Sequence, residues 1–122
     1  MAAIVGGERA AHLRDTTLAV YGKAAALAEE KGIIIADTKM EYGVREGRMI
    51  LIDELLTPDS SRFWSMKDYG PGRGQDSFDK QIVRDYLLTL DWDQTPPAPP
   101  LPPEIVDKAG ARYREILEIL TG

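Results

Sequence analysis

Apolar residues recur at three- and four-residue steps over residues 8–31, which predicts an amphipathic helix. The face of this helix that points to the core is formed by Leu13, Thr17, Val20, Tyr21, Ala24, Leu27 and Ala28. Alanine, the best helix former, is abundant here, and Gly32 stands where a C-terminal glycine cap belongs. The same periodicity predicts a second helix over residues 77–90 and a final helix from Ile105 to Leu120.

Between the first two helices the pattern changes to one that is typical of strands. Three consecutive isoleucines at 33–35 indicate a strand buried on both faces, and polar–apolar alternation follows Ala36. Residues 45–47 fit a three-residue hairpin loop with its glycine in the left-handed position, and residues 48–56 form the return strand. Residues 57–59 end that strand, because the proline among them cannot donate to a ladder.

Two further segments read as irregular structure. Residues 69–76 form a glycine-rich loop, and the proline-rich residues 95–103 cannot be helical in their middle and should run extended. No internal repeat is present. The pattern therefore predicts a single α+β domain over residues 1–122, in which an antiparallel hairpin-centred sheet is packed with about three helices.

Composition narrows the classes of protein. The chain has 122 residues, a net charge of -5 and no cysteine, which excludes disulfides and thiolate metal sites. No basic stripe is present to neutralise phosphates, so nucleic acid is not expected as a partner. No apolar run approaches the roughly 20 residues of a membrane-spanning helix, and the N-terminus lacks a signal-peptide pattern. We therefore expect a cytoplasmic protein that binds no membrane.

The predicted hairpin carries an unusual set of charges. Strand alternation places Asp37, Lys39 and Glu41 on one face. A three-residue loop would pair Lys39 with Asp53 and make Glu41 and Asp53 diagonal neighbours, about 7–8 Å apart, whereas a two-residue loop would split the charges between faces. Carboxylates so placed suit Mg²⁺, and the lysine suits a substrate phosphate or carboxylate. The alternative is a solvated face with cross-strand ion pairs.

Arg62 is a second candidate for anion binding. It follows Ser60 and Ser61, and a guanidinium beside hydroxyls and backbone amides suits bidentate binding of a phosphate or carboxylate. Stacking on Trp64 or pairing with Asp59 is the alternative.

Other polar residues give weaker signals. The glycine-rich loop lacks the spacing of a phosphate-binding loop. Lys80 and Gln81 open the second helix, and His12 lies early in the first. For each of these residues, a solvent-facing or partly packed position is the alternative to a functional role.

Three motifs in this order resemble SAICAR synthetase: GIIIADTKMEYG, ILIDELLTPDSSRFW and SFDKQIVRDYL. The resemblance covers residues 8–122 and corresponds to the C-terminal half of that family, a domain of ATP-grasp-like fold. It implies an ATP-dependent ligase of de novo purine biosynthesis. The family joins L-aspartate to carboxyaminoimidazole ribonucleotide (CAIR) through an acyl phosphate and releases SAICAR, ADP and phosphate.

The resemblance also implies roles for individual residues. Lys39, Asp37 and Asp59 are expected at the catalytic centre. Asp37 would lie at the nucleotide and metal end of the site, and Glu41 and Asp53 would hold Mg²⁺. The ribonucleotide would be bound by Lys39, Arg62 and Ser61. Asp59 would lie near the incoming aspartate. ATP and Mg²⁺ are the implied cofactors. Glu54, Lys80 and Gln81 receive no role.

Family members also carry a first, β-rich lobe with a glycine-rich segment over ATP, and the motifs above do not include it. We therefore expect this chain alone to bind ATP weakly and to turn over little. A second copy or a complementary N-terminal half would be its macromolecular partner. The alternatives are a non-catalytic interaction or regulatory domain that keeps the fold, and a kinase-like phosphotransferase for small molecules.

Overall fold

The computed structural model describes residues 2–78 and 80–122. Along the described chain the helices are α1 (Ala2–Val5), α2 (Gly7–Glu30), α3 (Gln81–Leu88) and α4 (Pro103–Thr121), and the strands are β1 (Ile33–Thr38), β2 (Glu41–Arg45), β3 (Arg48–Ile52) and β4 (Ser61–Ser65). The α+β class is confirmed. No helix within the described residues is long and apolar enough to cross a membrane.

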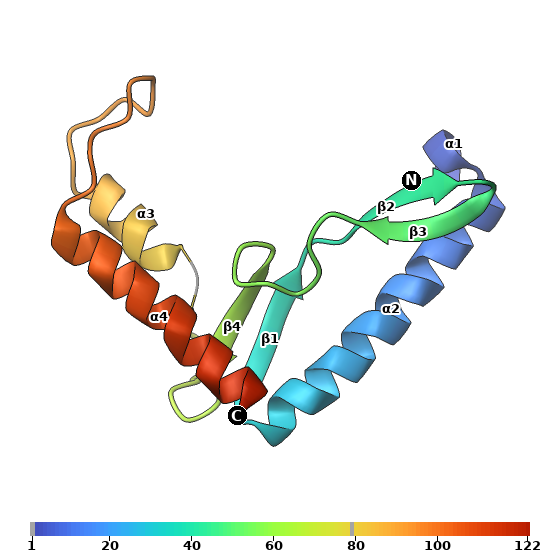
Figure 1. Ribbon diagram of the computed structural model, residues 1–122, viewed down its shortest axis with the longest axis horizontal. Helices are drawn as coiled ribbons and strands as arrows, with labels where there is room; N and C mark the ends of the chain where they lie inside the picture. The colour runs from blue at the N-terminus through green and yellow to red at the C-terminus, as the bar shows by residue number, and fades with distance from the viewer. Residues whose placement is uncertain (1, 79) are drawn as a thin grey trace.

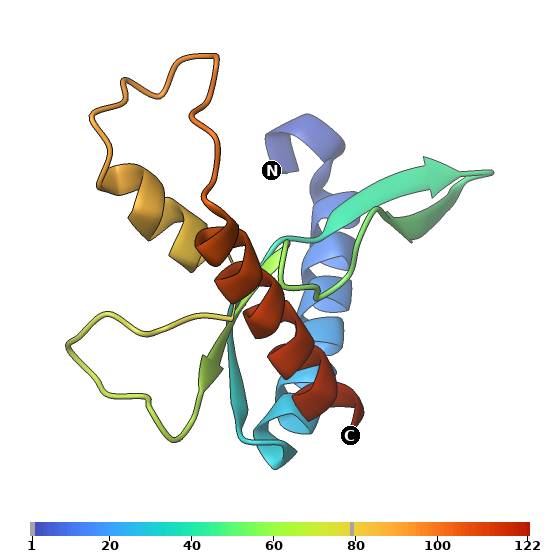
Figure 2. The ribbon, with the colours of Figure 1, turned by 60° about the vertical axis from the view of Figure 1, so that its left-hand side comes forward.

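The elements form a V with two arms (Figure 1). Helix α2 and the β2–β3 hairpin lie on one arm, and α3 and α4 lie on the other. Strands β1 and β4 lie between the arms, near the point where α2 and α4 approach each other. Turned by 60°, the chain keeps this open shape, with the loops before α3 and before α4 projecting away from the centre (Figure 2).

The helices agree closely with the sequence pattern, with two exceptions. Helix α4 covers its predicted segment and α2 covers all of its own except Lys31, while Gly32 follows α2 with a positive φ of 74°. Helix α3 begins at Gln81, four residues later than predicted, although Asp79 lies outside the described residues. The short helix α1 was not predicted.

The sheet differs from the prediction. Strands β1 and β4 form one two-stranded antiparallel sheet, and β2 and β3 form another. The strand predicted from Ile33 to Val44 is therefore broken, and its two parts, β1 and β2, lie in different sheets. Strand β4 was missed because its sequence, SRFWS, gives only five residues between a proline turn and a glycine-rich loop.

The hairpin register predicted from a three-residue loop is wrong. Val44 pairs with Met49 and Arg45 pairs with Arg48, so the loop contains two residues, Glu46 and Gly47. Both have positive φ, 51° and 75°, as a type I′ turn requires. Glu41 consequently pairs with Ile52 and not with Leu51, and the parity argument that brought Glu41 and Asp53 to one face of the ribbon fails.

The core is small and lies where the arms meet. It consists of buried side chains from α2, β1, β4, α4 and the segment before α3: Ala28, Ile33, Ile35, Phe63, Phe78 and Ile116. Phe63, Ile33 and Ile116 are the largest side chains that are fully buried. This cluster packs against β1 and β4 at the centre of the molecule, and the candidate site is built on the same two strands.

Candidate functional site

A β-bulge turns Asp37 away from the core. Ile35 pairs with Phe63, both of them buried, so an unbroken ladder would set Ala36 opposite Arg62. The register instead shifts between Ile35 and Asp37, and Asp37 becomes the partner of Arg62. Paired residues share a face, so the bulge carries Asp37 to the face opposite Phe63. Sequence alternation alone would have left Asp37 on the same face as Ile35.

Asp37 and Arg62 form a two-point ion pair across the strands. The Nε of Arg62 donates to Oδ1 of Asp37 at 2.9 Å, and its Nη2 donates to Oδ2. Both side chains are about half exposed. Hydrogen bonding by the guanidinium, with its positive charge, lowers the pKa of Asp37 below the ordinary aspartate value. Asp37 is therefore a carboxylate partner of Arg62 that the sequence analysis did not name.

A cavity of about 320 Å³ opens beside this pair. It is lined by Asp37, Asp59, Ser60, Ser61, Arg62 and Arg84. The structure therefore brings together four predicted site residues, Asp37, Asp59, Ser61 and Arg62. Ser61 is only 3% exposed, and its hydroxyl lies 2.8 Å from Oγ1 of Thr38, to which it donates.

Arg84 was missed by the sequence analysis. It lies on α3, about 20 residues from Arg62 in sequence, and it lines the same cavity. A helical arginine within a charged surface stretch gives no signal of its own, because charge runs on helices are usually solvated. Two guanidinium groups at one small cavity make it suited to an anionic ligand.

Asp59 connects the cavity to α3. Its carboxylate lies 2.5 Å from the ammonium of Lys80, the residue that precedes α3. Hydrogen bonding and charge from Lys80 lower the pKa of Asp59, and Asp59 raises the pKa of Lys80. Lys80 is therefore not simply a solvent-facing helix residue. Gln81, in contrast, donates to Asp85 along the exposed side of α3.

Lys39 is the centre of a second charged group. Its ammonium lies 2.7 Å from Oε1 of Glu41, and both side chains are substantially exposed. The hydrogen bond and the charge of Glu41 raise the pKa of Lys39, and the charges of Asp53 and Glu54 add to this effect. The three carboxylates therefore lie within electrostatic reach of one ammonium, although strand parity does not explain their arrangement.

The donors in this group have the chemistry that Mg²⁺ requires. Glu41, Asp53 and Glu54 supply carboxylate oxygens, and Mg²⁺ needs only one or two of these when phosphate oxygens and water complete its shell. Asp53 leaves β3 with a φ of 61°, so its direction is set by the turn and not by the alternation of the strand. No group of three or more potential ligands close enough to hold an ion by themselves occurs within the described residues. The donor types of these residues are compatible with Mg²⁺, but the described residues do not form a preassembled metal cluster.

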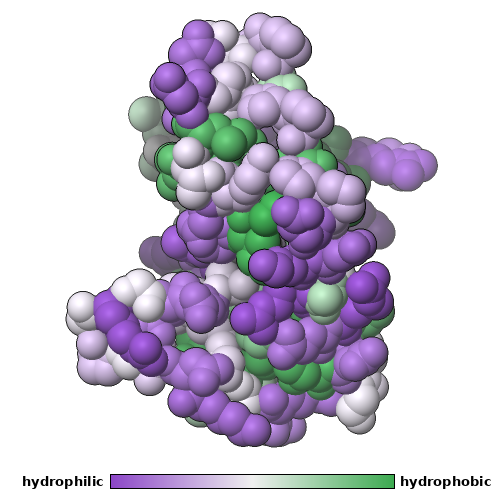
Figure 3. All heavy atoms as spheres, turned by 90° about the vertical axis from the view of Figure 1, so that its left-hand side faces the viewer, coloured by the Kyte–Doolittle hydropathy of each residue, from purple (hydrophilic) through white to green (hydrophobic). Residues whose placement is uncertain are grey.

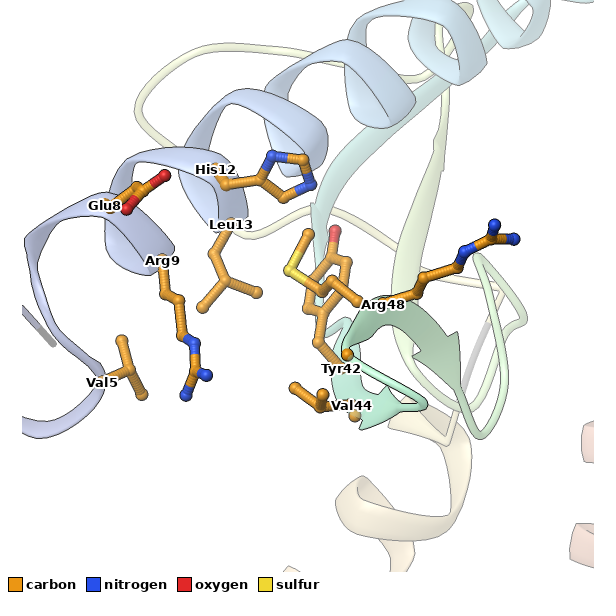
Figure 4. Close-up of a pocket in the computed structure, with 11 residues that line it drawn as sticks. Val5, Glu8, Arg9, His12, Leu13, Tyr42, Val44 and Arg48 are labelled. Atoms are coloured by element: carbon orange, nitrogen blue, oxygen red, sulfur yellow. The ribbon is translucent and has the colours of Figure 1, made fainter.

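His12 lies far from these groups along the chain. It lines a cavity of about 760 Å³ between α2 and the β2–β3 hairpin (Figure 4). Its neighbours there include Leu13, Tyr42 and Val44. Among the described residues that line this cavity, no two form a two-point ion pair like that of Asp37 and Arg62.

A profile described as SAICAR synthetase matches residues 1–99. The chain belongs to the SAICAR synthetase family. It is 62% identical over 118 residues to the phosphoribosylaminoimidazole-succinocarboxamide synthase of Thermodesulfovibrio yellowstonii, covering 97% of this chain and 40% of the relative. It is 61% identical over 122 residues to the enzyme of the same name from Citrifermentans bemidjiense, covering 100% of this chain and 41% of the relative.

Solved structures of the SAICAR synthetase family agree with this assignment. The Saccharomyces cerevisiae SAICAR-synthase complexed with SAICAR superposes with a TM-score of 0.88 at 44% identity, over 99% of this chain and 41% of that one. A SAICAR synthetase in complex with ADP gives a TM-score of 0.66 at 27% identity, over 94% of this chain and 39% of that one. The chain thus spans about two fifths of the length of the relatives that it matches.

Proposed function

We propose that this chain supplies one side of the active site of an ATP-dependent ligase of purine biosynthesis, which joins L-aspartate to CAIR to give SAICAR, ADP and phosphate. The observation that carries the proposal is the cavity in which Arg62 and Arg84 meet Asp37 and Asp59. A site with two guanidinium groups and adjacent carboxylates suits substrates that bear phosphate, carboxylate and ammonium groups together. The proposed reaction is that of the SAICAR synthetase family, to which the chain belongs.

The residues divide into an anion-binding group and a cation-binding group. Arg62 and Arg84 would hold the phosphate or carboxylate of the ribonucleotide, with the serines beside them supplying polar contacts. Lys39 would neutralise charge on the transferring phosphoryl group or the imidazole carboxylate. Asp59 would bind the ammonium of the incoming aspartate. Its carboxylate already contacts one ammonium group, that of Lys80, in this structure.

The chemistry proceeds in two displacements. An oxygen of the CAIR carboxylate attacks the γ-phosphorus of ATP and ADP leaves. The aspartate amine then attacks the acyl carbon of the acyl phosphate, phosphate leaves and the nitrogen loses a proton. Glu41 and Asp53 would hold Mg²⁺, which neutralises phosphate charge. Phosphoryl transfer depends mainly on positioning and charge, and the paired groups of this site provide both.

Reconstitution tests the proposal. The part of the C. bemidjiense relative that lies outside the matched region, called here the complementary segment, is mixed with this chain, and SAICAR formation is followed with ATP, Mg²⁺, CAIR and L-aspartate. We expect SAICAR from the mixture and little from either part alone. A complex that forms but produces no SAICAR would refute the ligase function.

Two other functions give different results in the same assay. Sustained ADP release over many turnovers without L-aspartate would indicate a phosphotransferase, because the ligase can release only about one ADP per site before aspartate attacks the acyl phosphate. Binding of the complementary segment without affinity for ATP or CAIR would indicate a non-catalytic interaction domain. The open surface of the chain, 8777 Å², is the observation that favours this second candidate.

A further inference from the structure

The chain exposes more surface than a compact protein of its size. Size scaling gives about 6,500 Å² for a monomer of 13.5 kDa, whereas this chain exposes 8777 Å². The excess is roughly 2,200 Å², and one partner in a standard protein–protein interface loses only about 800 Å². Hydrophobic atoms reach the surface between hydrophilic ones on the face shown in Figure 3. Part of this surface is of the kind that interfaces cover.

Part of the unpacked surface lies on the arm that carries α2. This helix has 24 residues, yet Ala28 is its only buried residue within the described structure. Isolated helices are marginally stable in water, and most helix stability in proteins comes from packing of an apolar face. Leu18, which is 61% exposed, lies on the part of α2 that has no such packing.

The hairpin presents an apolar face to the same space. Tyr42 pairs with Leu51 and Val44 pairs with Met49, so these four apolar side chains share one face. A hydrogen bond of 2.9 Å between the hydroxyls of Tyr42 and Thr17 ties that face to α2. Beyond this contact the two surfaces are separated by the cavity of about 760 Å³.

The cavity therefore has apolar walls on both sides. Val5 and Leu13 face it from the helices, and Tyr42 and Val44 face it from the hairpin (Figure 4). Helix and ribbon surfaces normally pack directly against each other, because apolar faces must be buried. Here a cavity of about 760 Å³ separates them. We call this space the α2–hairpin groove.

We propose that the α2–hairpin groove is the docking site of the complementary segment, which inserts an apolar stretch of chain between helix and hairpin. About three fifths of the C. bemidjiense relative lies outside the 41% that this chain matches, so a polypeptide of sufficient length exists in the family. The superposition at a TM-score of 0.88 means that this chain has the shape of the corresponding part of a larger protein. The proposal rests on the proposed function only for the identity of the partner.

A binding experiment with two matched variants tests the docking site. Val44 on the groove and Leu117 on α4 are both 60% exposed, so Val44→Asp and Leu117→Asp add the same charge at equally accessible positions. Affinity of the complementary segment for each variant is measured by calorimetry, and circular dichroism of each variant verifies the fold. We expect Val44→Asp to weaken binding at least tenfold and Leu117→Asp to leave it within about twofold.

Several results would overturn the proposal. The complementary segment could fail to bind, or it could bind Val44→Asp as tightly as the unmodified chain. A chain that is dimeric alone and becomes monomeric on Val44→Asp, without binding the segment, would make a second copy the occupant. Equal weakening by both variants would place the interface elsewhere. None of these measurements uses turnover, so loss of the ligase function and loss of the docking site can be told apart.

Discussion

Asp37 and Arg62 are placed by one extra residue in a strand. The bulge at Ala36 lets an aspartate follow a buried isoleucine without entering the core. The guanidinium then neutralises the carboxylate that the bulge exposes. The pair lies at the surface, in the cavity that a ligand would enter. Its contribution to stability can be measured in the chain without ligand, and its contribution to binding can be measured with ligand added.

The stability contribution of Asp37 should depend on pH in a defined direction. The pKa of Asp37 is lowered by Arg62, so its stabilisation is present above the ordinary value of about 3.9 and is lost as pH falls through the lower folded value. Asp37→Asn should lower the free energy of unfolding at pH 7 by no more than about 1 kcal/mol, because both groups are half exposed. Urea unfolding at pH 7 and pH 3 measures this, with Asp107→Asn as the control. A difference that grows towards low pH would contradict the assignment.

Arg62→Lys should weaken phosphate binding in the reconstituted complex. An ammonium keeps the charge but cannot present the planar fork of a guanidinium. Loss of one charge-assisted hydrogen bond corresponds to roughly a tenfold higher Kd for inorganic phosphate, which calorimetry measures. Arg45→Lys on the hairpin, away from the cavity, is the matched control. Unchanged affinity in Arg62→Lys would remove this residue from the binding site.

At the scale of elements, the turn between β2 and β3 decides the hairpin register. Glu46 and Gly47 both adopt positive φ, and the second position is the one that glycine fills at no steric cost. Gly47→Ala has free space around the new methyl group but a strained backbone. We expect it to lower the free energy of unfolding by about 1 kcal/mol in urea titrations. Gly74→Ala, which is equally open and has no positive φ, should change stability much less.

Helix α4 is held by very few buried side chains. Ile116 is 1% exposed, and its neighbour Leu117 is 60% exposed. Ile116→Ala should cost about 2–5 kcal/mol because it removes a core side chain and leaves a cavity. Leu117→Ala should cost at most about 0.5 kcal/mol. Urea unfolding followed by circular dichroism compares the two, and similar losses would show that α4 is not anchored through Ile116.

These elements also show which features local sequence could predict. The periodicity of α2 and α4 predicted both helices, since a 3.6-residue repeat does not depend on distant contacts. The hairpin was found but its register was not, because Glu46 is an unusual residue for the first position of a type I′ turn. The pairing of β1 with β4 joins Ile35 to Phe63 across 27 intervening residues. Such a pairing, and the cavity lined by Arg84, depend on tertiary structure that no local pattern records.

At the scale of the whole molecule, a small core supports two long arms. Six buried apolar residues join the arms at β1 and β4, while the outer half of α2 and the hairpin extend beyond them. Lys39 and Glu41 lie at the junction of the hairpin with β1, so the charged site is continuous with the hairpin arm. A partner that orders the hairpin would also order this end of the site.

Hydrogen exchange should reveal that ordering. In the chain alone, amides of residues 7–18 in α2 should exchange faster than those near Ala28, because only the latter end is anchored in the core. The complementary segment at about 100 times its Kd should slow exchange on residues 7–18 and on β2–β3 by up to about 100-fold, since opening then requires its release. Amides of α4 serve as the internal reference and should change little, because α4 lies on the other arm. Slowing confined to α4, or spread evenly over both arms, would mean that the segment does not dock between α2 and the hairpin.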